Sequence, residues 1–220
     1  FKILRLTRGL LVLSREKDLI PENLFKSLPA LVKIFLKIIP PNKKYGLSES
    51  LQKLGPTWIK MGQFLSTRPD IIGKELSIHL RELQDSIPPF DKKFVEMAFI
   101  ESFGEDYKEK FEKIEEPIAA ASIAQVHKAI IKINKTSQMV AVKILRPNIE
   151  DRIKKDLKDF YLAAKILEKF SSEARRLRII DVVKTLEESL SMEIDLRLEA
   201  AAQSDCLLYT SDAADELRSV

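Results

Sequence analysis

Apolar residues recur at helical spacing through the first half of the chain. Between residues 47 and 65 they step by four and three positions, which places them on one helical face. That face is formed by Leu47, Leu51, Leu54, Trp58, Met61 and Leu65. Gly55-Pro56 interrupts the pattern, so it predicts two helices, with Pro56 near the start of the second.

Two more helices are expected before the character of the sequence changes. Residues 71–85 look helical, and Pro88-Pro89 closes them. A further helix is predicted from Asp91 to about Ser102, with Gly104 following its end.

Two β-rich runs follow Pro117. Residues 126–133 and 139–145 are rich in β-branched side chains, and the polar residues 134–138 separate them. This arrangement predicts a hairpin with a loop of about five residues.

Helical spacing returns after Pro147. It predicts one helix over residues 149–164 and another over 183–198. Helices therefore precede and follow the hairpin, which indicates an α+β fold.

Composition excludes several classes of protein. The chain has 220 residues, of which 45% are hydrophobic, and this is enough to bury a core. Its longest stretch without a charged side chain lies between Glu116 and Lys128, and is shorter than the roughly 18 residues that a membrane-spanning helix needs. The single cysteine, Cys206, precludes an internal disulfide, and two histidines, His79 and His127, are too few for a His/Cys zinc site.

Basic residues gather at the start of the chain. Residues 1–44 hold ten Lys or Arg and three acids, a local charge of +7 in a chain whose net charge is +4. Apolar residues are interleaved with them, which suits an anionic membrane surface; the alternative is a solvated helical pair that packs on its own domain. No basic-aromatic recognition motif is present, so nucleic acid is not an expected partner.

One lysine stands where it could do chemistry. Lys143 lies late in the second β-rich run, and strand alternation puts it on the same face as Ala141. Kinases use such a strand lysine to hold nucleotide phosphates, and a helix carboxylate holds the lysine in turn. A lysine in a strand is by itself usually just exposed, so this residue alone leaves both interpretations open.

A run of small residues precedes the hairpin. It comprises Ile118, Ala119, Ala120, Ala121, Ser122, Ile123, Ala124, Gln125 and Val126. Its spacing is that of a kinase glycine-rich loop with alanine where glycine would stand, or of an ordinary turn between a helix and a strand. Alanine adds a Cβ and disfavours positive φ, so the loop should be stiffer and grip phosphate differently.

Several motifs together resemble those of the UbiB/ADCK family of atypical kinase-like ATPases, and the bacterial, ubiquinone-associated branch is the closest in wording. Residues 118–127 resemble its alanine-rich loop, and residues 54–70 resemble its KxGQ signature. Residues 193–195 resemble its ExD segment, and residues 196–201 resemble the helix that carries the lysine's partner. Each motif is weak alone, but together, in the family's order, they are highly specific.

The resemblance implies the roles of the nucleotide-site residues. Lys143 matches the lysine that holds nucleotide phosphates, and Glu199 matches its ion-pair partner. The loop 118–126 matches the segment that lies over the nucleotide.

The resemblance also implies roles for a second group of residues. Lys60, Gly62 and Gln63 match the KxGQ motif, which in the family reaches into the pocket where a protein substrate would otherwise bind. The ExD acids associated with that contact are matched by Glu193 and Asp195.

Helical spacing agrees with these roles. Lys60 and Gln63 are three apart and share a helix face, and Asp195 and Glu199 are four apart and are expected to share another. Gly62 costs helix stability, which is tolerable if another backbone passes close. The alternative for each charged residue is a solvated helix charge.

The expected fold is therefore protein kinase-like, with a truncated N-lobe. Residues 1–110 should form a helical extension that carries the KxGQ motif, and residues 111–204 should form the kinase-like N-lobe. Residues 205–220 break the helical pattern and resemble sequencing-adapter read-through, so a non-native tail is expected. No catalytic-loop Asp and Asn and no DFG-type motif follow Glu199, so this fragment should lack phosphoryl-transfer activity.

For the complete protein, the resemblance implies binding of ATP or ADP with Mg²⁺, and slow ATP hydrolysis or an unorthodox kinase activity that supports ubiquinone (coenzyme Q) biosynthesis. Its expected partners are the nucleotide, anionic membrane lipid or isoprenoid quinone intermediates, and other ubiquinone-biosynthesis proteins. The expected location is the cytoplasmic face of a bacterial inner membrane. Two alternatives stay open: a nucleotide-gated, non-catalytic protein that handles lipids, and a helical scaffold without a nucleotide site.

Overall fold

The computed structural model describes residues 33–34, 46–83, 87–133 and 136–206. The basic segment 1–44, apart from residues 33–34, lies outside the described residues, as do residues 207–220 of the expected tail. Within the described ranges, no helix combines the length and the apolar character that crossing a bilayer requires.

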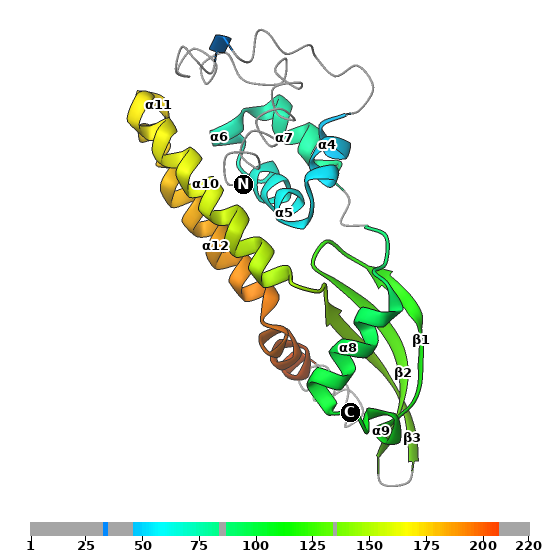
Figure 1. The fold of residues 1–220 in the computed structure, drawn as a ribbon. Coiled ribbons are helices and arrows are strands. Elements are labelled where there is room, and N and C mark those ends of the chain that lie inside the picture. Colours follow the sequence, from blue (N-terminus) through cyan, green and yellow to red (C-terminus); the bar gives the residue numbers. More distant parts are fainter. Residues whose placement is uncertain (1–32, 35–45, 84–86, 134–135, 207–220) are drawn as a thin grey trace, which may run out of the picture.

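Short helices at the start of the described chain build one core (Figure 1). They are α4 (Leu47–Leu54), α5 (Pro56–Ser66), α6 (Pro69–Ile72) and α7 (Lys74–Arg81). Pro56 opens α5 at its first turn, as expected, because proline has no amide hydrogen to leave unpaired there. The single helix predicted over residues 71–85 is wrong: Gly73 has a φ of 82°, which ends α6 and starts α7.

The β-sheet has three antiparallel strands in the order β1-β2-β3. They are β1 (Phe111–Ala120), β2 (Ala124–Ile133) and β3 (Thr136–Leu145). The expected five-residue loop is wrong, since residues 136–138 pair with residues 131–133 and only two residues remain between the strands. These polar side chains are exposed at the end of the hairpin, where a strand tolerates them, so their composition falsely indicates a turn.

One helix covers one face of this sheet (Figure 1). The helix is α8 (Lys92–Phe103), and the short α9 (Tyr107–Lys110) leads from it into β1. Asp91 caps α8 by accepting the Lys93 amide, and Gly104 ends it with a φ of 88°. Val95 and Phe99 pack against Ala129 and Ile144 of the sheet, so β2 and β3 each bury one face here.

A long helical hairpin follows the sheet: α10 (Ile149–Phe170), α11 (Ser172–Arg176) and α12 (Ile179–Ile194). It buries a third core, which also includes Ile123, just before β2, and Ala124, the first residue of β2. Trp58 of α5 packs edge-on against Phe160 of α10, with ring centroids 4.9 Å apart. The short helices and the sheet therefore both rest on this hairpin.

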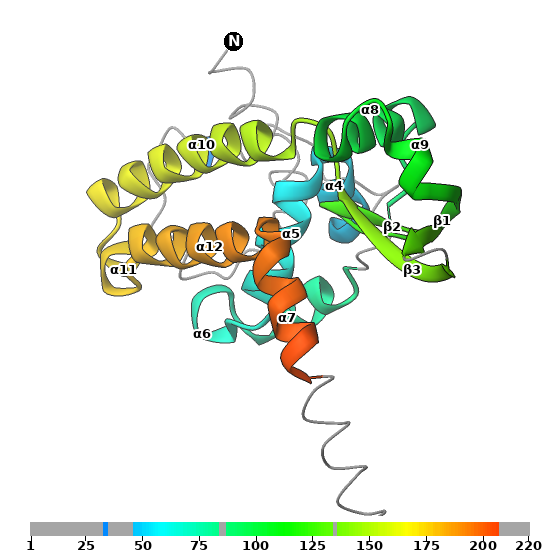
Figure 2. The same cartoon turned by 90° about the horizontal axis from the view of Figure 1, so that it is seen from below.

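The helix predicted over residues 183–198 is interrupted. α12 ends at Ile194, Asp195 lies outside any helix, and residues 196–206 form a new helix that leaves in another direction (Figure 2). The Asp195 carboxylate accepts the Arg197 amide at 3.1 Å, so it caps the new helix, a position that aspartate favours. Asp195 and Glu199 consequently do not share one continuous helix face, and Leu198 is 55% exposed rather than part of the α12 stripe.

Candidate functional site

An ion pair joins the sheet to the helix that follows Asp195. Lys143 Nζ of β3 donates to both carboxylate oxygens of Glu199, at 2.9 and 2.6 Å. The two side chains are 33% and 40% exposed, so solvent reaches the pair. The expected pairing of Lys143 with Glu199 is thus present, and its role at nucleotide phosphates stays a prediction.

The strand register shows what surrounds the lysine. Val126 of β2 pairs with Lys143, and Ala119 of β1 pairs with Val126, so these three side chains project from the same face of the sheet. Ala141 and Lys128, which pair with each other, lie on the same face. This face is opposite to the one that α8 covers. Small side chains around a half-buried cation leave room for a flat ligand with negative charge.

A cleft of about 670 Å³ runs beside β3. It extends from α8 to the first turn of α10, and Lys143 and Leu196 line part of it. This volume is within the range of about 300–1,000 Å³ that small-molecule sites occupy. The cleft contains α8 residues but neither Val126 nor Ala141, so it lies along the edge of β3 rather than over the open face that carries Lys143.

The expected loop 118–126 is a tight turn between two strands. Its first three residues end β1, its last three begin β2, and only residues 121–123 lie between the strands. The Ala121 amide donates to the Ala124 carbonyl at 2.8 Å and closes the turn. Residues 121–123 are hereafter the alanine turn.

Residues of the predicted loop face different surroundings. Ile118 and Ala119 are exposed, and Ala120, Ala121 and Val126 are half-buried. Four residues are buried: Ser122, Ile123, Ala124 and Gln125. The role of residues 118–126 over a nucleotide stays a prediction, and the Gln125 side chain bonds with protein groups on the α8 side rather than lying on the Lys143 face.

The KxGQ residues lie on α5, against α12. Lys60 forms an ion pair with Glu193, and its side chain is only 14% exposed. Gln63 is half-buried one turn later, and its carbonyl accepts the Ser66 hydroxyl at 2.6 Å. The expected association of KxGQ with the first ExD acid is therefore present in the geometry, and the functional roles of both motifs stay predictions.

Gly62 is needed for packing between side chains. A Cβ at this position would clash with Leu83 Cδ1 and would lie 2.9 Å from Leu51 Cδ1. The expectation that another backbone passes close is wrong, because leucine side chains occupy that space.

Asp195 binds Arg197, which lies two residues later in the chain. Its carboxylate binds the Arg197 guanidinium through two bonds of 3.0 Å. The hydrogen bonds from Arg197 lower the pKa of the Asp195 carboxyl below its ordinary value. The two ExD acids thus do different things here: Glu193 reaches α5, while Asp195 caps the next helix.

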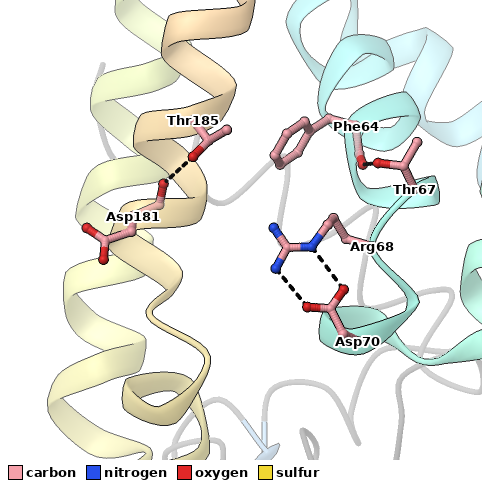
Figure 3. A network of polar contacts seen from close by, with 6 residues as sticks. All are labelled: Phe64, Thr67, Arg68, Asp70, Asp181 and Thr185. Atoms are coloured by element: carbon pink, nitrogen blue, oxygen red, sulfur yellow. Dashed lines mark hydrogen bonds and ion pairs between the residues drawn. The ribbon is translucent and has the colours of Figure 1, made fainter.

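The end of α5 also faces α12 (Figure 3). Arg68 binds both oxygens of Asp70, at 2.9 and 2.7 Å, and the Thr67 hydroxyl donates to the Phe64 carbonyl. Figure 3 shows this segment opposite Asp181 and Thr185 on α12, with the Phe64 ring turned toward that helix. These local bonds lie where α5 ends and α6 begins.

Metal ligands are not evident in the part of the chain that the structure describes. No group of three His, Cys, Asp or Glu side chains there could hold a metal ion. The described residues thus offer no preformed metal site, while Lys143 offers a cation to an anionic ligand.

Comparison with protein families identifies the region that contains this site. The family described as "ABC1 atypical kinase-like domain" matches residues 82–215. That match includes residues 205–215, and the non-native origin expected for residues 205–220 stays a prediction.

Curated proteins match a larger part of the chain. A "Probable protein kinase UbiB" of Azotobacter vinelandii is 42% identical over 156 residues, which are 70% of this chain and 28% of that protein. The protein of the same name from Marinobacter nauticus is 38% identical over 186 residues, or 80% of this chain and 34% of that protein. The one from Pseudomonas aeruginosa PAO1 is 41% identical over 156 residues. The chain thus spans about a third or less of the length of these relatives.

Proposed function

Because the chain belongs to the ABC1 atypical kinase-like family, we propose that it is the part of a UbiB-type protein that binds the phosphates of ATP or ADP. The observation that carries this proposal is the Lys143–Glu199 ion pair, which lies on an open sheet face beside a cleft. Within kinase-like folds, a strand lysine held by a helix carboxylate contacts nucleotide phosphates.

The geometry supports a specific division of labour. Lys143 Nζ would hold phosphate oxygens, and Glu199 would position that ammonium group through its two hydrogen bonds. The alanine turn would lie over the phosphates, and Val126 and Ala141 would contact the flat base. ATP, when bound, supplies a phosphoryl group or the free energy of its hydrolysis; no step is assigned to Mg²⁺, since the described residues offer it no ligand set.

We further propose that the complete protein supports ubiquinone biosynthesis, as an ATPase or as an unorthodox kinase. The UbiB names of the relatives support this, and those names describe probable protein kinases. A nucleotide-gated protein that presents lipid intermediates is the alternative with the same residues. In a full-length relative that lacks its catalytic aspartate, continued quinone synthesis would favour the gated protein over the enzyme.

The nucleotide proposal is tested by titrating the 220-residue chain with a fluorescent ADP analogue. We expect Lys143→Ala and Glu199→Gln each to weaken binding about tenfold or more, because a hydrogen bond to a charged group contributes roughly 1.5–3 kcal/mol. Lys154→Ala is the matched control, since Lys154 forms an exposed ion pair with Glu150 on α10. Equal affinity of the wild type and Lys143→Ala would contradict the proposal.

We separately propose that the chain binds an anionic membrane surface, as a protein at the cytoplasmic face of a membrane would. Residues 1–44 carry a charge of +7 with apolar residues between the basic ones. We expect the chain to sediment with vesicles of anionic lipid and to be released as salt is raised, because salt screens exposed charges. Equal sedimentation with neutral and anionic vesicles would contradict this.

A further inference from the structure

The linker between the short helices and α8 lies against the alanine turn. Its sequence, Ile87-Pro88-Pro89-Phe90, contains two prolines, so it is stiff and has only two backbone amides to donate. The Ile87 amide donates to the Ala120 carbonyl at 3.4 Å, and the Phe90 amide donates to Gln125 Oε1 at 2.9 Å. Both of the linker's amides therefore bond to residues that flank the turn.

Arg146 fastens the same two segments from the end of β3. Its Nε donates to the Ala121 carbonyl and its Nη2 to the Pro88 carbonyl, both at 3.0 Å. Its backbone amide donates to the Ile123 carbonyl at 2.8 Å. The guanidinium also lies 5.7 Å from the centre of the Phe90 ring. One arginine thus bonds to both ends of the turn and to the linker.

Gln125 completes the connection from inside the sheet. Its side chain is 1% exposed, and its amide nitrogen lies 2.8 Å from His127 Nε2. An amide nitrogen can only donate, so His127 Nε2 accepts and Nδ1 carries the proton. His127 Nδ1 then donates to the Glu115 carbonyl at 2.7 Å.

An irregularity in β1 makes this last bond available. The register between β1 and β2 shifts between Ile114 and Pro117, so the Glu115 carbonyl lies at a bulge. A buried chain of bonds therefore runs from the linker through Gln125 and His127 to β1. Every polar atom in this chain has a partner, which favours one rotamer of Gln125 over others.

We propose that Gln125 and Arg146 are positioning residues that set the shape of the alanine turn by fastening it to the linker 87–90. This inference rests on the proposed function, because its consequence is that the fastened turn determines how tightly nucleotide phosphates are held. Gln125 is buried on the α8 side and cannot touch the nucleotide, whereas Arg146 also lines the cleft beside β3, so Gln125→Ala is the variant that separates positioning from direct contact.

Hydrogen exchange of backbone amides in the nucleotide-free 220-residue chain tests the fastening directly. We expect exchange at Ala121 and Phe90 to rise at least tenfold in Gln125→Ala and in Arg146→Lys, which keeps the charge but loses the planar fork. Gln125→Glu keeps an acceptor for the Phe90 amide and should restore protection of that amide relative to Gln125→Ala. Exchange at Leu190, in the core of the helical hairpin, should stay unchanged and so report a local effect.

A control variant lies at the far end of the hairpin. Ser137 lies near the start of β3, at the opposite end from Arg146; Ser137→Ala removes its hydrogen bond to Glu112 of β1 and should leave exchange at Ala121 unchanged. Affinity for the fluorescent ADP analogue should fall about fivefold or more in Arg146→Lys and Gln125→Ala, and not in Ser137→Ala.

The possible outcomes separate this inference from the nucleotide proposal. Unchanged exchange at Ala121 and Phe90 in both variants would overturn the fastening, whatever the affinity. Raised exchange with unchanged nucleotide affinity would overturn the positioning role and leave nucleotide binding intact. Absence of nucleotide binding by the wild type would overturn the proposed function and, with it, the role at phosphates, while the exchange data would still decide whether the turn is fastened.

Discussion

Gly62, in the helix that carries Lys60, leaves space for two leucine side chains of the core. Replacing it with alanine gains helix propensity, roughly 1 kcal/mol, but adds a methyl group that meets Leu83 and Leu51. Both leucines are core residues, and overpacking costs about 1–3 kcal/mol. The packing cost therefore exceeds the propensity gain.

We expect Gly62→Ala to lower the free energy of unfolding by about 1 kcal/mol. Chemical denaturation of the chain measures this. Gly46→Ala is the control, because a Cβ at that position, which precedes α4, would meet no atom within 4 Å. A stabilised Gly62→Ala variant would mean that the leucines rearrange freely and that helix propensity decides the outcome.

At this scale, the sequence predicts partners better than it predicts surroundings. The pairing of Lys143 with Glu199 follows from motif resemblance alone, although 56 positions separate the residues. The bonding of Gln125 does not, since it depends on the Phe90 amide in a linker that no motif includes. The amino-acid sequence of the loop alone does not distinguish a buried glutamine from one that faces a ligand.

Among the larger elements, α10 and α12 are joined by a shared core and by polar contacts, one of which is the Ile180 amide donating to Glu168 Oε1 at 2.8 Å. The Tyr161 hydroxyl of α10 donates to the Glu187 carboxylate of α12 at 2.6 Å. Burial and this hydrogen bond to Glu187 raise the pKa of Tyr161 from 10.0 to about 12. The folded state thus favours the protonated hydroxyl, and the resulting stability is fully present below pH 10 and is lost as the pH rises to about 12.

We therefore predict that Tyr161→Phe is less stable than the wild type at neutral pH, by about 1 kcal/mol, because the hydrogen bond to a charged group is lost from a half-buried site. The difference should shrink between pH 10 and 12, where the wild type loses its extra stability. Denaturation of both chains across this range measures the effect, and absorbance titration of the tyrosinates follows the group directly. A constant difference through pH 12 would contradict the prediction, because it would show that ionisation of the Tyr161 hydroxyl is not linked to unfolding.

The helices with strong amphipathic spacing were predictable, and the irregular elements were not. The residues of α10 that repeat every three to four positions, such as Ile149, Ile153 and Leu157, are all buried. The strand β1 was not predicted from the sequence. It is an edge strand with three register shifts, so its charged side chains do not alternate regularly with buried ones. The helix break at Asp195 was not predicted either. A single aspartate is common inside helical sequences, so the residues around it still showed helical spacing.

That break organises the whole molecule. Glu193 ends α12 and binds Lys60 of the short helices, whereas Glu199 lies beyond the break and binds Lys143 of the sheet. On one continuous helix, residues six apart would project at widely different angles about a common axis. Because Asp195 redirects the chain, the two acids meet two separate elements, and the sheet, the short helices and the helical hairpin are connected through one segment (Figure 2).

We predict that this 220-residue chain does not transfer phosphoryl groups, even where it binds nucleotide. Phosphoryl transfer depends on metal ions that bridge the phosphates and on an acid that orients the nucleophile. Glu193 is engaged with Lys60, Glu199 with Lys143 and Asp195 with Arg197, so the acids near the site already serve as ion-pair partners. The face that carries Lys143 is also open to solvent, where charge on a transition state is screened rather than stabilised by fixed dipoles.

Phosphate release from ATP, with and without Mg²⁺, measures this prediction at a chain concentration that saturates the fluorescent ADP analogue. We expect the rate with the chain to equal that of buffer, and the rate with Lys143→Ala to be the same. Magnesium-dependent hydrolysis that disappears in Lys143→Ala would contradict the prediction, since it would require ligands for the metal among residues that have another role here. Hydrolysis that survives in Lys143→Ala would instead point to a contaminating ATPase, because it would not involve the phosphate-holding lysine.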